Sequence, residues 1–337
     1  MVENALTGAD AQALRRQWFR YLDTVEPLQP ALHAYCLRLA RNLWDAEDLV
    51  QEALLRAFAM TARGDFHGEA SPVRSAKAYL FRTATNLWLD HRRRRQLEVG
   101  APDPAEPLAS DPDPVATDAA LSHAAELTSA RELAALLLKD VYDFRLEEVA
   151  DFIGTTPGTV KSLLHRARRR VRANSAEGAV GAAEPDRAAG NPRRRADDGT
   201  RALVRALVEA MNARDVERVL GLMAESLKVD VCNVGGGRGR DGIWTERSLS
   251  GWRFEYAEHD GEPVMLLFEV AGRELAGAVR LEADGGSITR LVDYHYAADT
   301  LRALAGALGL DCHERGYHQP AADLVGMVST TGLPWRS

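Results

Sequence analysis

Six side chains in the C-terminal part of the chain are of the types that exchange protons or line a ligand site: Asp230, Trp252, Tyr256, His259, Asp293 and His295. Carboxylate, imidazole and phenol groups act as acids and bases when a fold holds them within hydrogen-bonding reach of a substrate. Polar residues also alternate along any half-exposed strand without doing chemistry. The pattern favours a structural, protein-contacting role, with a small-ligand site and a catalytic site as the alternatives.

A glycine-rich stretch at residues 233–242 has the composition of a loop that cradles phosphate. Phosphate-binding loops require a Lys-Ser/Thr pair or a GxGxxG spacing, with a helix directly after. The stretch has neither the Walker spacing nor a lysine, and its surroundings predict antiparallel strands instead of the βαβ unit in which a GxGxxG loop binds phosphate. We therefore expect a loop that contacts another domain through five residues: Gly235, Gly236, Gly237, Arg238 and Arg240.

Basic residues are concentrated in two blocks, although the net charge of the chain is −7. Residues 91–95 contain four arginines, and residues 161–172 contain no acidic residue. Cations gathered on one face of a helix are typical of proteins that bind the phosphate backbone of nucleic acid, and a solvated charge run is the alternative.

The second basic block lies in a pattern of three short helices, expected at residues 132–141, 146–153 and 157–171. Thr156 is placed to cap the last of them, and Pro157 suits its first position. An apolar stripe follows at Val160, Leu163, Leu164, Ala167 and Val171. This arrangement predicts a helix-turn-helix whose last helix enters the major groove. The residues expected to face DNA are Thr156, Thr159, Lys161, Ser162, His165, Arg166 and Arg169.

The sequence as a whole divides into three folded units joined by two linkers. Helical periodicity predicts an all-α unit at residues 10–96, and the helix-turn-helix belongs to a second unit at residues 121–173. Residues 200–311 predict two helices, five strands and a last helix at residues 298–308, an α+β unit. An acidic, proline-rich linker at residues 97–120 and a flexible linker at residues 174–199 separate them, and a tail covers residues 312–337.

The cysteines and the hydropathy pattern limit the possible locations. Cys36, Cys232 and Cys312 are odd in number and far apart, which argues against a disulfide framework. The spacing of His33 and Cys36 is typical of metal ligands, but one such pair on an apolar helix indicates core packing. No apolar run is long enough for a membrane span, and no export signal is visible. We expect a cytoplasmic protein without a metal or a cofactor.

Four stretches resemble the extracytoplasmic-function (ECF) sigma factors of bacterial RNA polymerase. They are residues 45–52 (DAEDLVQE), 78–94 (AYLFRTATNLWLDHRRR), 146–151 (LEEVAD) and 158–170 (GTVKSLLHRARRR). The resemblance implies that the first unit is sigma region 2 and that the second is region 4, which reads the −35 element. It further implies partners, namely promoter DNA and the polymerase core with its largest-subunit clamp helices and its flap.

The resemblance also assigns residues to these partners. The polymerase-binding residues would be Asp45, Glu47, Asp48, Gln51 and Glu52. The residues facing the −10 element would be Arg82, Asn86, Arg92, Arg93, Arg94 and Arg95. A loop at residues 61–74 would capture a flipped base, with Phe66 and His67 as stacking surfaces. The acidic linker would thread through the cleft of the polymerase.

The third unit resembles the cone-shaped SnoaL-like domains by its element order and by residues 288–296 (ITRLVDYHY). Such a domain in some ECF sigma factors implies regulation in cis, without a separate anti-sigma factor. We therefore expect a multidomain sigma factor that is not an enzyme, with a small ligand in the cone as a possibility. A one-component regulator and an enzyme with a DNA-binding appendage are the rival hypotheses, and residues 45–52 argue against both.

Overall fold

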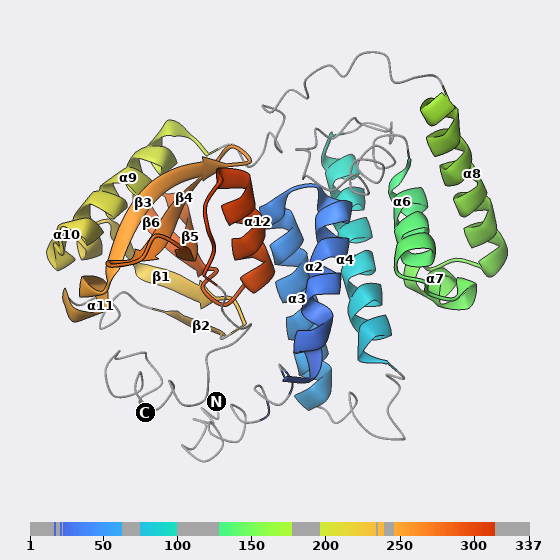
Figure 1. Cartoon of the computed structure of the whole chain (residues 1–337), viewed down its shortest axis with the longest axis horizontal. Helices are drawn as coiled ribbons and strands as arrows, with labels where there is room; N and C mark the ends of the chain where they lie inside the picture. The colour runs from blue at the N-terminus through green and yellow to red at the C-terminus, as the bar shows by residue number, and fades with distance from the viewer. Residues whose placement is uncertain are drawn as a thin grey trace. The chain divides into compact units, whose positions relative to one another are not determined.

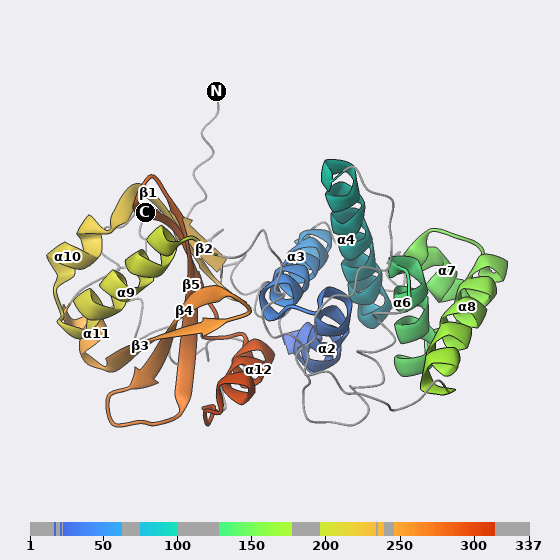
Figure 2. The same cartoon turned by 90° about the horizontal axis from the view of Figure 1, so that it is seen from above.

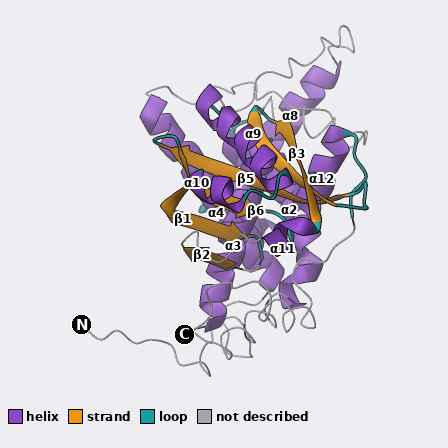
Figure 3. Cartoon of the chain, turned by 90° about the vertical axis from the view of Figure 1, so that its left-hand side faces the viewer, coloured by secondary structure: helices purple, strands orange, loops and turns teal. Residues whose placement is uncertain are grey.

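The computed structural model describes residues 17, 21, 23–62, 75–99, 128–176, 196–233, 235–238 and 246–313 (Figure 1). The chain divides into two compact units. One comprises Val25–Gly190, and the other comprises Asn191–Ser337 together with Met1–Thr24. The first contains two groups of helices, which we call the first and second helical domains. The second contains all the described strands, and we call it the sheet domain (Figure 3).

The first helical domain contains the 3₁₀ turn η1 (Glu26–Leu28) and the helices α2 (Gln29–Ala40), α3 (Leu43–Ala62) and α4 (Ala76–Val99). Local signals set the break between α2 and α3. Arg41 takes the left-handed conformation at φ 57°, and the Asn42 side chain accepts the backbone N–H of Asp45 at 2.9 Å. Apolar side chains at helical spacing, including Leu32, Leu39 and Leu49, are buried.

The second helical domain contains α6 (Ala130–Leu136), the π-helical turn η2 (Leu137–Val141), α7 (Leu146–Ile153) and α8 (Pro157–Ala176). The predicted helix-turn-helix is confirmed. Gly154 ends α7 in the left-handed conformation at φ 70°, where a side chain would be strained. Thr156 then accepts the backbone N–H of Thr159 at 3.2 Å and caps α8 as expected.

The two helical domains, expected as separate units, pack together in one. Helix α4 lies against α6 and α7, and α2 also contacts α6. Aromatic rings fill the seam, with the rings of Phe81 in α4 and Phe144 before α7 centred 5.2 Å apart. The proline-rich linker between the two domains lies outside the described residues.

The sheet domain begins with α9 (Asp198–Asn212) and α10 (Val216–Gly221), continues through six strands, and ends with α12 (Ala298–Leu308). The strands are β1 (Met223–Val231), β2 (Gly235–Arg238), β3 (Trp252–His259), β4 (Glu262–Glu269), β5 (Leu275–Asp284) and β6 (Ser287–Asp293), with the short helix α11 (Glu246–Ser250) before β3. Their order in the sheet is β2-β1-β6-β5-β4-β3. An antiparallel sheet was expected, and the parallel pairing of β1 with β6 corrects this to a mixed sheet.

Helix α9 covers one face of this sheet and provides much of its core. Val204, Leu207 and Met211 of α9 pack against a buried cluster that includes Met265 and Val279 of the central strands. Figure 2 shows α12 on the other side of the sheet from α9. The architecture is the α+β arrangement predicted for residues 200–311.

Two predicted hairpin turns are confirmed. Asp260 and Gly261 have φ of 52° and 77° between β3 and β4, and Gly285 and Gly286 have φ of 56° and 81° between β5 and β6. Positive φ at both central residues is the requirement of a type I′ turn.

None of the described helices is both long enough and apolar enough to cross a membrane. Within the same described residues, no group of three or more His, Cys, Asp or Glu side chains is placed to hold a metal ion. The three cysteines are free.

Candidate nucleic-acid and polymerase interfaces

Helix α8 borders a groove of about 670 Å³ in the second helical domain. Leu146 and Leu164 contribute its apolar lining. The rest of the lining consists of basic side chains: Lys139, Lys161, His165, Arg168, Arg169 and Arg172. Three of them, Lys161, His165 and Arg169, were expected to face DNA. The other three were missed, although Arg168 and Arg172 belong to the basic block visible in the sequence.

Alternate arginines of α8 are bound to acidic residues of their own domain. Arg166 and Arg170 reach the two carboxylate oxygens of Glu132 in α6, at 2.8 and 2.5 Å. Arg168 makes two contacts with Asp140 of the π-turn, at 3.0 and 2.6 Å. Arg166, predicted as a DNA contact, therefore also holds α8 against α6, and its side chain is 49% exposed.

Glu132 is the buried centre of this cluster, with a side chain 3% exposed. Burial alone would raise the pKa of its carboxyl. The hydrogen bonds from Arg166 and from the Ser129 backbone, with the charge of Arg170, outweigh burial and hold the pKa below its usual range. The carboxylate is thus charged at neutral pH and fixes two arginines on one side of α8.

The hydroxyl groups at the start of α8 serve the helix itself. The oxygens Oγ1 of Thr156 and Thr159 lie 2.9 Å apart, and the hydroxyl of Ser162 donates to the Gly158 carbonyl at 3.2 Å. All three side chains belong to exposed residues, so they remain accessible to a base edge.

Helix α4 presents the second predicted DNA surface. Its Ser75 cap accepts the backbone N–H of Ala78 at 3.3 Å. Asn86 is exposed, whereas Arg82 pairs with Asp151 of α7 at 3.2 Å. Both residues line a pocket of about 270 Å³ together with Arg56, Tyr79, Thr83 and Asp151.

The arginine-rich end of α4 is partly described. Arg93 and Arg94 are exposed, Arg92 is half-buried, and Arg93 pairs with Asp90 at 3.2 Å. The side chain of Arg95 lies outside the described residues, as do residues 63–74 with the predicted base-capturing Phe66 and His67.

Helix α3 carries the five residues expected to bind the polymerase. One of them, Glu47, is buried and does not share the exposed face of the other four. It lies 3.9 Å from the His33 imidazole and accepts a hydrogen bond from Gln51 at 2.7 Å. Its carboxylate faces the domain interior, which corrects its place on the binding face. Asp45, Asp48 and Gln51 are half-buried, and Glu52 is exposed.

The His33 and Cys36 pair packs in the core, as predicted. Both residues are buried, and burial raises the pKa of the Cys36 thiol. The thiol therefore stays protonated and inert.

The glycine stretch is a strand where a loop was expected. Residues 235–238 form β2 at one edge of the sheet, antiparallel to β1, with Asp230 opposite Gly236. Asn233 supplies the turn with φ 62°. The Arg238 side chain and Arg240 lie outside the described residues, so their predicted interdomain contact stays a prediction.

The six candidate acid–base residues are divided between the two faces of the sheet: Trp252 and Tyr256 pack against the core cluster that includes α9, whereas Asp230 lies on the other face. Trp252 and His295 meet edge to face at 5.6 Å, and Asp293 accepts the backbone N–H of His295 at 2.8 Å. Asp230 pairs with Arg290 at 2.6 Å, and it lies opposite Val292, so it points to the other face of the sheet from Asp293. His259 stands at the β3–β4 hairpin beside Asp260, at 3.5 Å.

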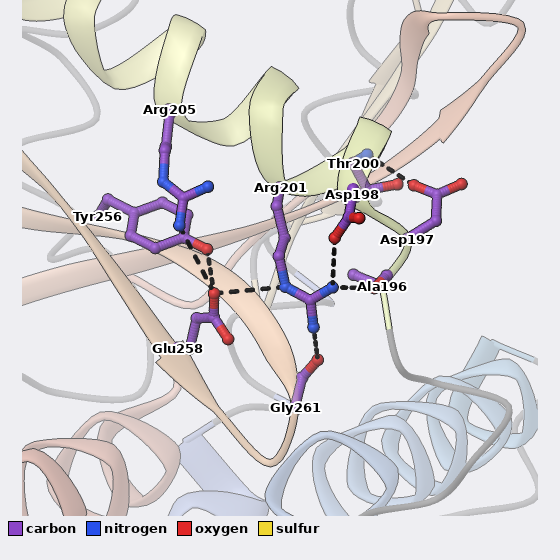
Figure 4. Close-up of polar contacts among 9 residues, drawn as sticks. All are labelled: Ala196, Asp197, Asp198, Thr200, Arg201, Arg205, Tyr256, Glu258 and Gly261. Carbon is purple, nitrogen blue, oxygen red and sulfur yellow. Dashed lines mark hydrogen bonds and ion pairs between the residues drawn. The ribbon is translucent and has the colours of Figure 1, made fainter.

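Tyr256 also belongs to a polar cluster near the start of α9 (Figure 4). Burial and its hydrogen bond to Glu258 raise the pKa of Tyr256 to about 12. Arg205 lies 4.2 Å from the centre of its ring, and Arg201 pairs with Glu258 at 3.3 Å. Arg201 also donates to the carbonyls of Ala196 and Gly261. The cluster anchors the first turn of α9 to the β3–β4 hairpin.

Comparison with known proteins agrees with this division of the chain. Residues 24–98 match the family Sigma-70 region 2, and residues 129–171 match Sigma-70, region 4. The chain is 36% identical over 149 residues to the ECF RNA polymerase sigma factor SigL of Mycobacterium tuberculosis, a match that covers 42% of this chain and 80% of SigL. The chain belongs to the ECF sigma factors.

The ECF relatives extend the similarity beyond the helical domains. SigG of Mycobacterium tuberculosis is 32% identical over 261 residues, which cover 67% of this ECF chain and 61% of SigG. Among solved structures, the sigma factor RpoE from Bartonella quintana, in complex with the anti-sigma factor NepR, has 27% identity, covers 47% of this chain and 97% of its own, and has a TM-score of 0.39.

Membership of the ECF family gives names to the two helical domains. The first helical domain is region 2 and the second is region 4, in the order that the sequence predicted. The groove beside α8 is therefore on region 4, and the pocket beside α4 is lined by residues of region 2 and by Asp151 of region 4.

Proposed function

We propose that this chain is an alternative sigma factor that directs core RNA polymerase to promoters and starts transcription. The basic groove beside α8 carries the proposal, because six basic side chains line one side of a helix-turn-helix. Lys161, His165, Arg169 and Arg172 would bind phosphates and base edges of the −35 element. The hydroxyls of Thr156, Thr159 and Ser162 would approach base edges near the start of α8.

Region 2 would supply the other two contacts. Asp45, Asp48, Gln51 and Glu52 would meet a basic surface of the polymerase core, for which an acidic face is complementary. Asn86 and Arg82, with the arginines at the end of α4, would bind the −10 element. Glu47 has no part in this proposal.

Transcription of sheared genomic DNA from the source organism, with purified core polymerase and sequencing of transcript 5′ ends, tests the function. The full chain and a chain ending at Gly190, the boundary of the helical unit, should both be tried. We expect new start sites that share −35 and −10 sequences. The double variant Lys161→Ala, Arg169→Ala should lose them, and start sites identical to those of core polymerase alone would refute the function.

We further propose that the sheet domain regulates in cis and does not catalyse. The engagement of Asp230 by Arg290 and of Tyr256 by Glu258 supports a role without chemistry, because both side chains already serve contacts within the domain. The expected result is a changed transcript yield on removal of residues after Gly190. Equal yields from both chains would contradict cis regulation. The cytoplasm is the compartment in which such a factor would meet the polymerase.

A further inference from the structure

A short segment of region 4 is inserted against region 2. Tyr142, which directly follows the π-turn, packs its ring 4.9 Å from Phe81 of α4 and edge-on at 5.4 Å from Tyr35 of α2. The Tyr142 hydroxyl accepts a hydrogen bond from Arg38 of α2 at 3.0 Å. This residue of region 4 is therefore held by two helices of region 2.

The contact continues along α4. Phe144 packs on Phe81 and is 6% exposed. The Lys77 ammonium lies 5.0 Å from the centre of the Phe144 ring and donates to the Tyr142 carbonyl at 3.4 Å. These rings and the cation over one of them bury Phe81 and Phe144, and we call Tyr142, Phe144, Phe81 and Lys77 the aromatic seam.

Asp151 of α7 also contacts α4, and it lines the pocket beside that helix. Its carboxylate is 3.2 Å from the Arg82 guanidinium, and it lines the pocket with Asn86 and Arg56. A carboxylate and a phosphate offer a guanidinium the same pair of acceptor oxygens. Arg82 and Asn86 are two of the residues proposed to bind the −10 element.

The strengths of the two contacts differ. The Arg82 and Asp151 side chains are 42% and 64% exposed, and exposed ion pairs contribute little to the stability of a fold. The aromatic seam therefore holds region 4 on region 2, while Asp151 places a negative charge beside Arg82 in the pocket.

We propose that Asp151 occupies, within the same chain, the position of a DNA phosphate in the pocket of Arg82 and Asn86, so that docking of region 4 and DNA binding by this pocket exclude one another. The inference rests on the proposed function for one point, the binding of DNA by α4. A carboxylate and a phosphate bound to the same guanidinium repel one another. The free chain would bind DNA weakly, and its affinity would rise when region 4 leaves the pocket.

Binding of a labelled single-stranded oligonucleotide to the full chain without polymerase tests the proposal, alongside hydrogen exchange of the α4 amides. Asp151→Asn keeps the shape and removes the charge, and we expect binding roughly threefold tighter with unchanged exchange. Tyr142→Ala should undock region 4, speed exchange at the seam and tighten binding about tenfold if nine-tenths of the chain is docked. Tyr142→Phe retains the ring and should stay close to the wild type.

Glu147→Gln is the matched control, because it removes one negative charge from an exposed residue of the same helix α7, away from the pocket lining. It should leave DNA binding unchanged. Arg82→Ala, added to Asp151→Asn, should abolish the gain in affinity. It should also lower the salt dependence by about 0.7 in log–log slope, as expected for one phosphate of a single strand.

Equal affinities of the wild type and Asp151→Asn would overturn the inference, as would a gain that survives Arg82→Ala. Should Tyr142→Ala fail to fold, as circular dichroism would show, the exposed Asp151 variants still decide the matter. If promoter-specific transcripts form with polymerase but neither Asp151→Asn nor Tyr142→Ala binds DNA more tightly than the wild type, the proposed function stands and the inference is wrong. Tighter binding without any specific transcript removes the proposed function and supports the inference.

Discussion

Helices α4 and α8 each carry five arginines, yet the acidic partners of these arginines differ in burial and in origin. In α8, Arg166 and Arg170 are bound to Glu132, a buried residue of the same domain. In α4, Arg82 is bound to Asp151, an exposed residue of the other helical domain. A buried acid that gives up its arginines to a DNA phosphate is left as an unpaired buried charge, which destabilises the fold, whereas an exposed acid is then solvated by water. The burial of the partner therefore distinguishes a structural arginine from one available to DNA.

The largest expected effect comes from removing the buried acid. Glu132→Gln should lower the free energy of unfolding of region 4 by about 1.5–3 kcal/mol at neutral pH, because two charge-assisted hydrogen bonds lose their acceptor charge. Urea unfolding followed by circular dichroism measures the loss. Glu147→Gln, at an exposed position, is the control and should stay within about 0.5 kcal/mol of the wild type.

The same variant has a defined pH dependence. The folded pKa of Glu132 is depressed, so its stabilising contribution is present above the unfolded value of roughly pH 4.5 and is lost as pH falls through the folded pKa. Wild type and Glu132→Gln should therefore converge in stability on acidification. A stability difference that stays constant from neutral pH to well below pH 4 would show that the charge of Glu132 is irrelevant.

Adjacent arginines of α8 offer a sharper comparison. Arg169 lines the groove and Arg170 is bound to Glu132. Arg169→Ala should weaken binding of duplex DNA roughly tenfold at low salt and reduce the log–log salt slope by about 0.9, as for one lost phosphate contact. Arg170→Ala should reduce stability and preserve the slope. Fluorescence anisotropy across a salt series measures the affinity and the salt slope of both variants. Equal slopes would show that Arg169 and Arg170 do not differ in phosphate contact.

The cap of α8 has a smaller effect. Thr156→Ala removes the acceptor for the Thr159 backbone N–H and should cost about 1 kcal/mol of stability. Thr156→Ser keeps the oxygen and serves as the control. Thermal unfolding that fails to separate the two variants would mean that Thr156 does not cap the helix in solution.

The smallest effect on stability is expected at α3. Glu52 forms an exposed pair with Arg56 at 2.8 Å, so Glu52→Gln should change stability by less than about 0.5 kcal/mol. It should nevertheless weaken binding to core polymerase in a pull-down titration. Glu47→Gln should show the reverse, a larger loss of stability and unchanged polymerase binding in the folded fraction.

Local signals explain why the helix boundaries were predictable from the sequence. The bounds of α7 and α12, and the start of α8 at Pro157, match the expectation, because Gly154 and Thr156 act on the residues next to them. The hairpin turns follow from Asp-Gly and Gly-Gly pairs in the same way.

Contacts between distant residues explain what was missed. In the sequence, Glu47 is indistinguishable from the other acidic residues of the stretch 45–52. Only its packing beside His33 in the folded domain shows that it is buried. The engagement of Arg166 depends on Glu132, 34 residues away. The parallel pairing of β1 with β6 likewise joins strands far apart in sequence, and neither strand carries a local mark of its neighbour's direction.

The length of the π-turn η2 determines the direction in which the residues after it point. The backbone N–H of Tyr142 reaches the carbonyl of Leu137, five residues back, at 3.1 Å. Deleting one residue between Leu137 and Val141 would relax this turn to an ordinary α-helical one and rotate everything after it by about 100°. Tyr142 would then point away from Phe81, and Asp140 away from Arg168. Natural variants of this chain should tolerate substitutions in η2 far better than a change in its length.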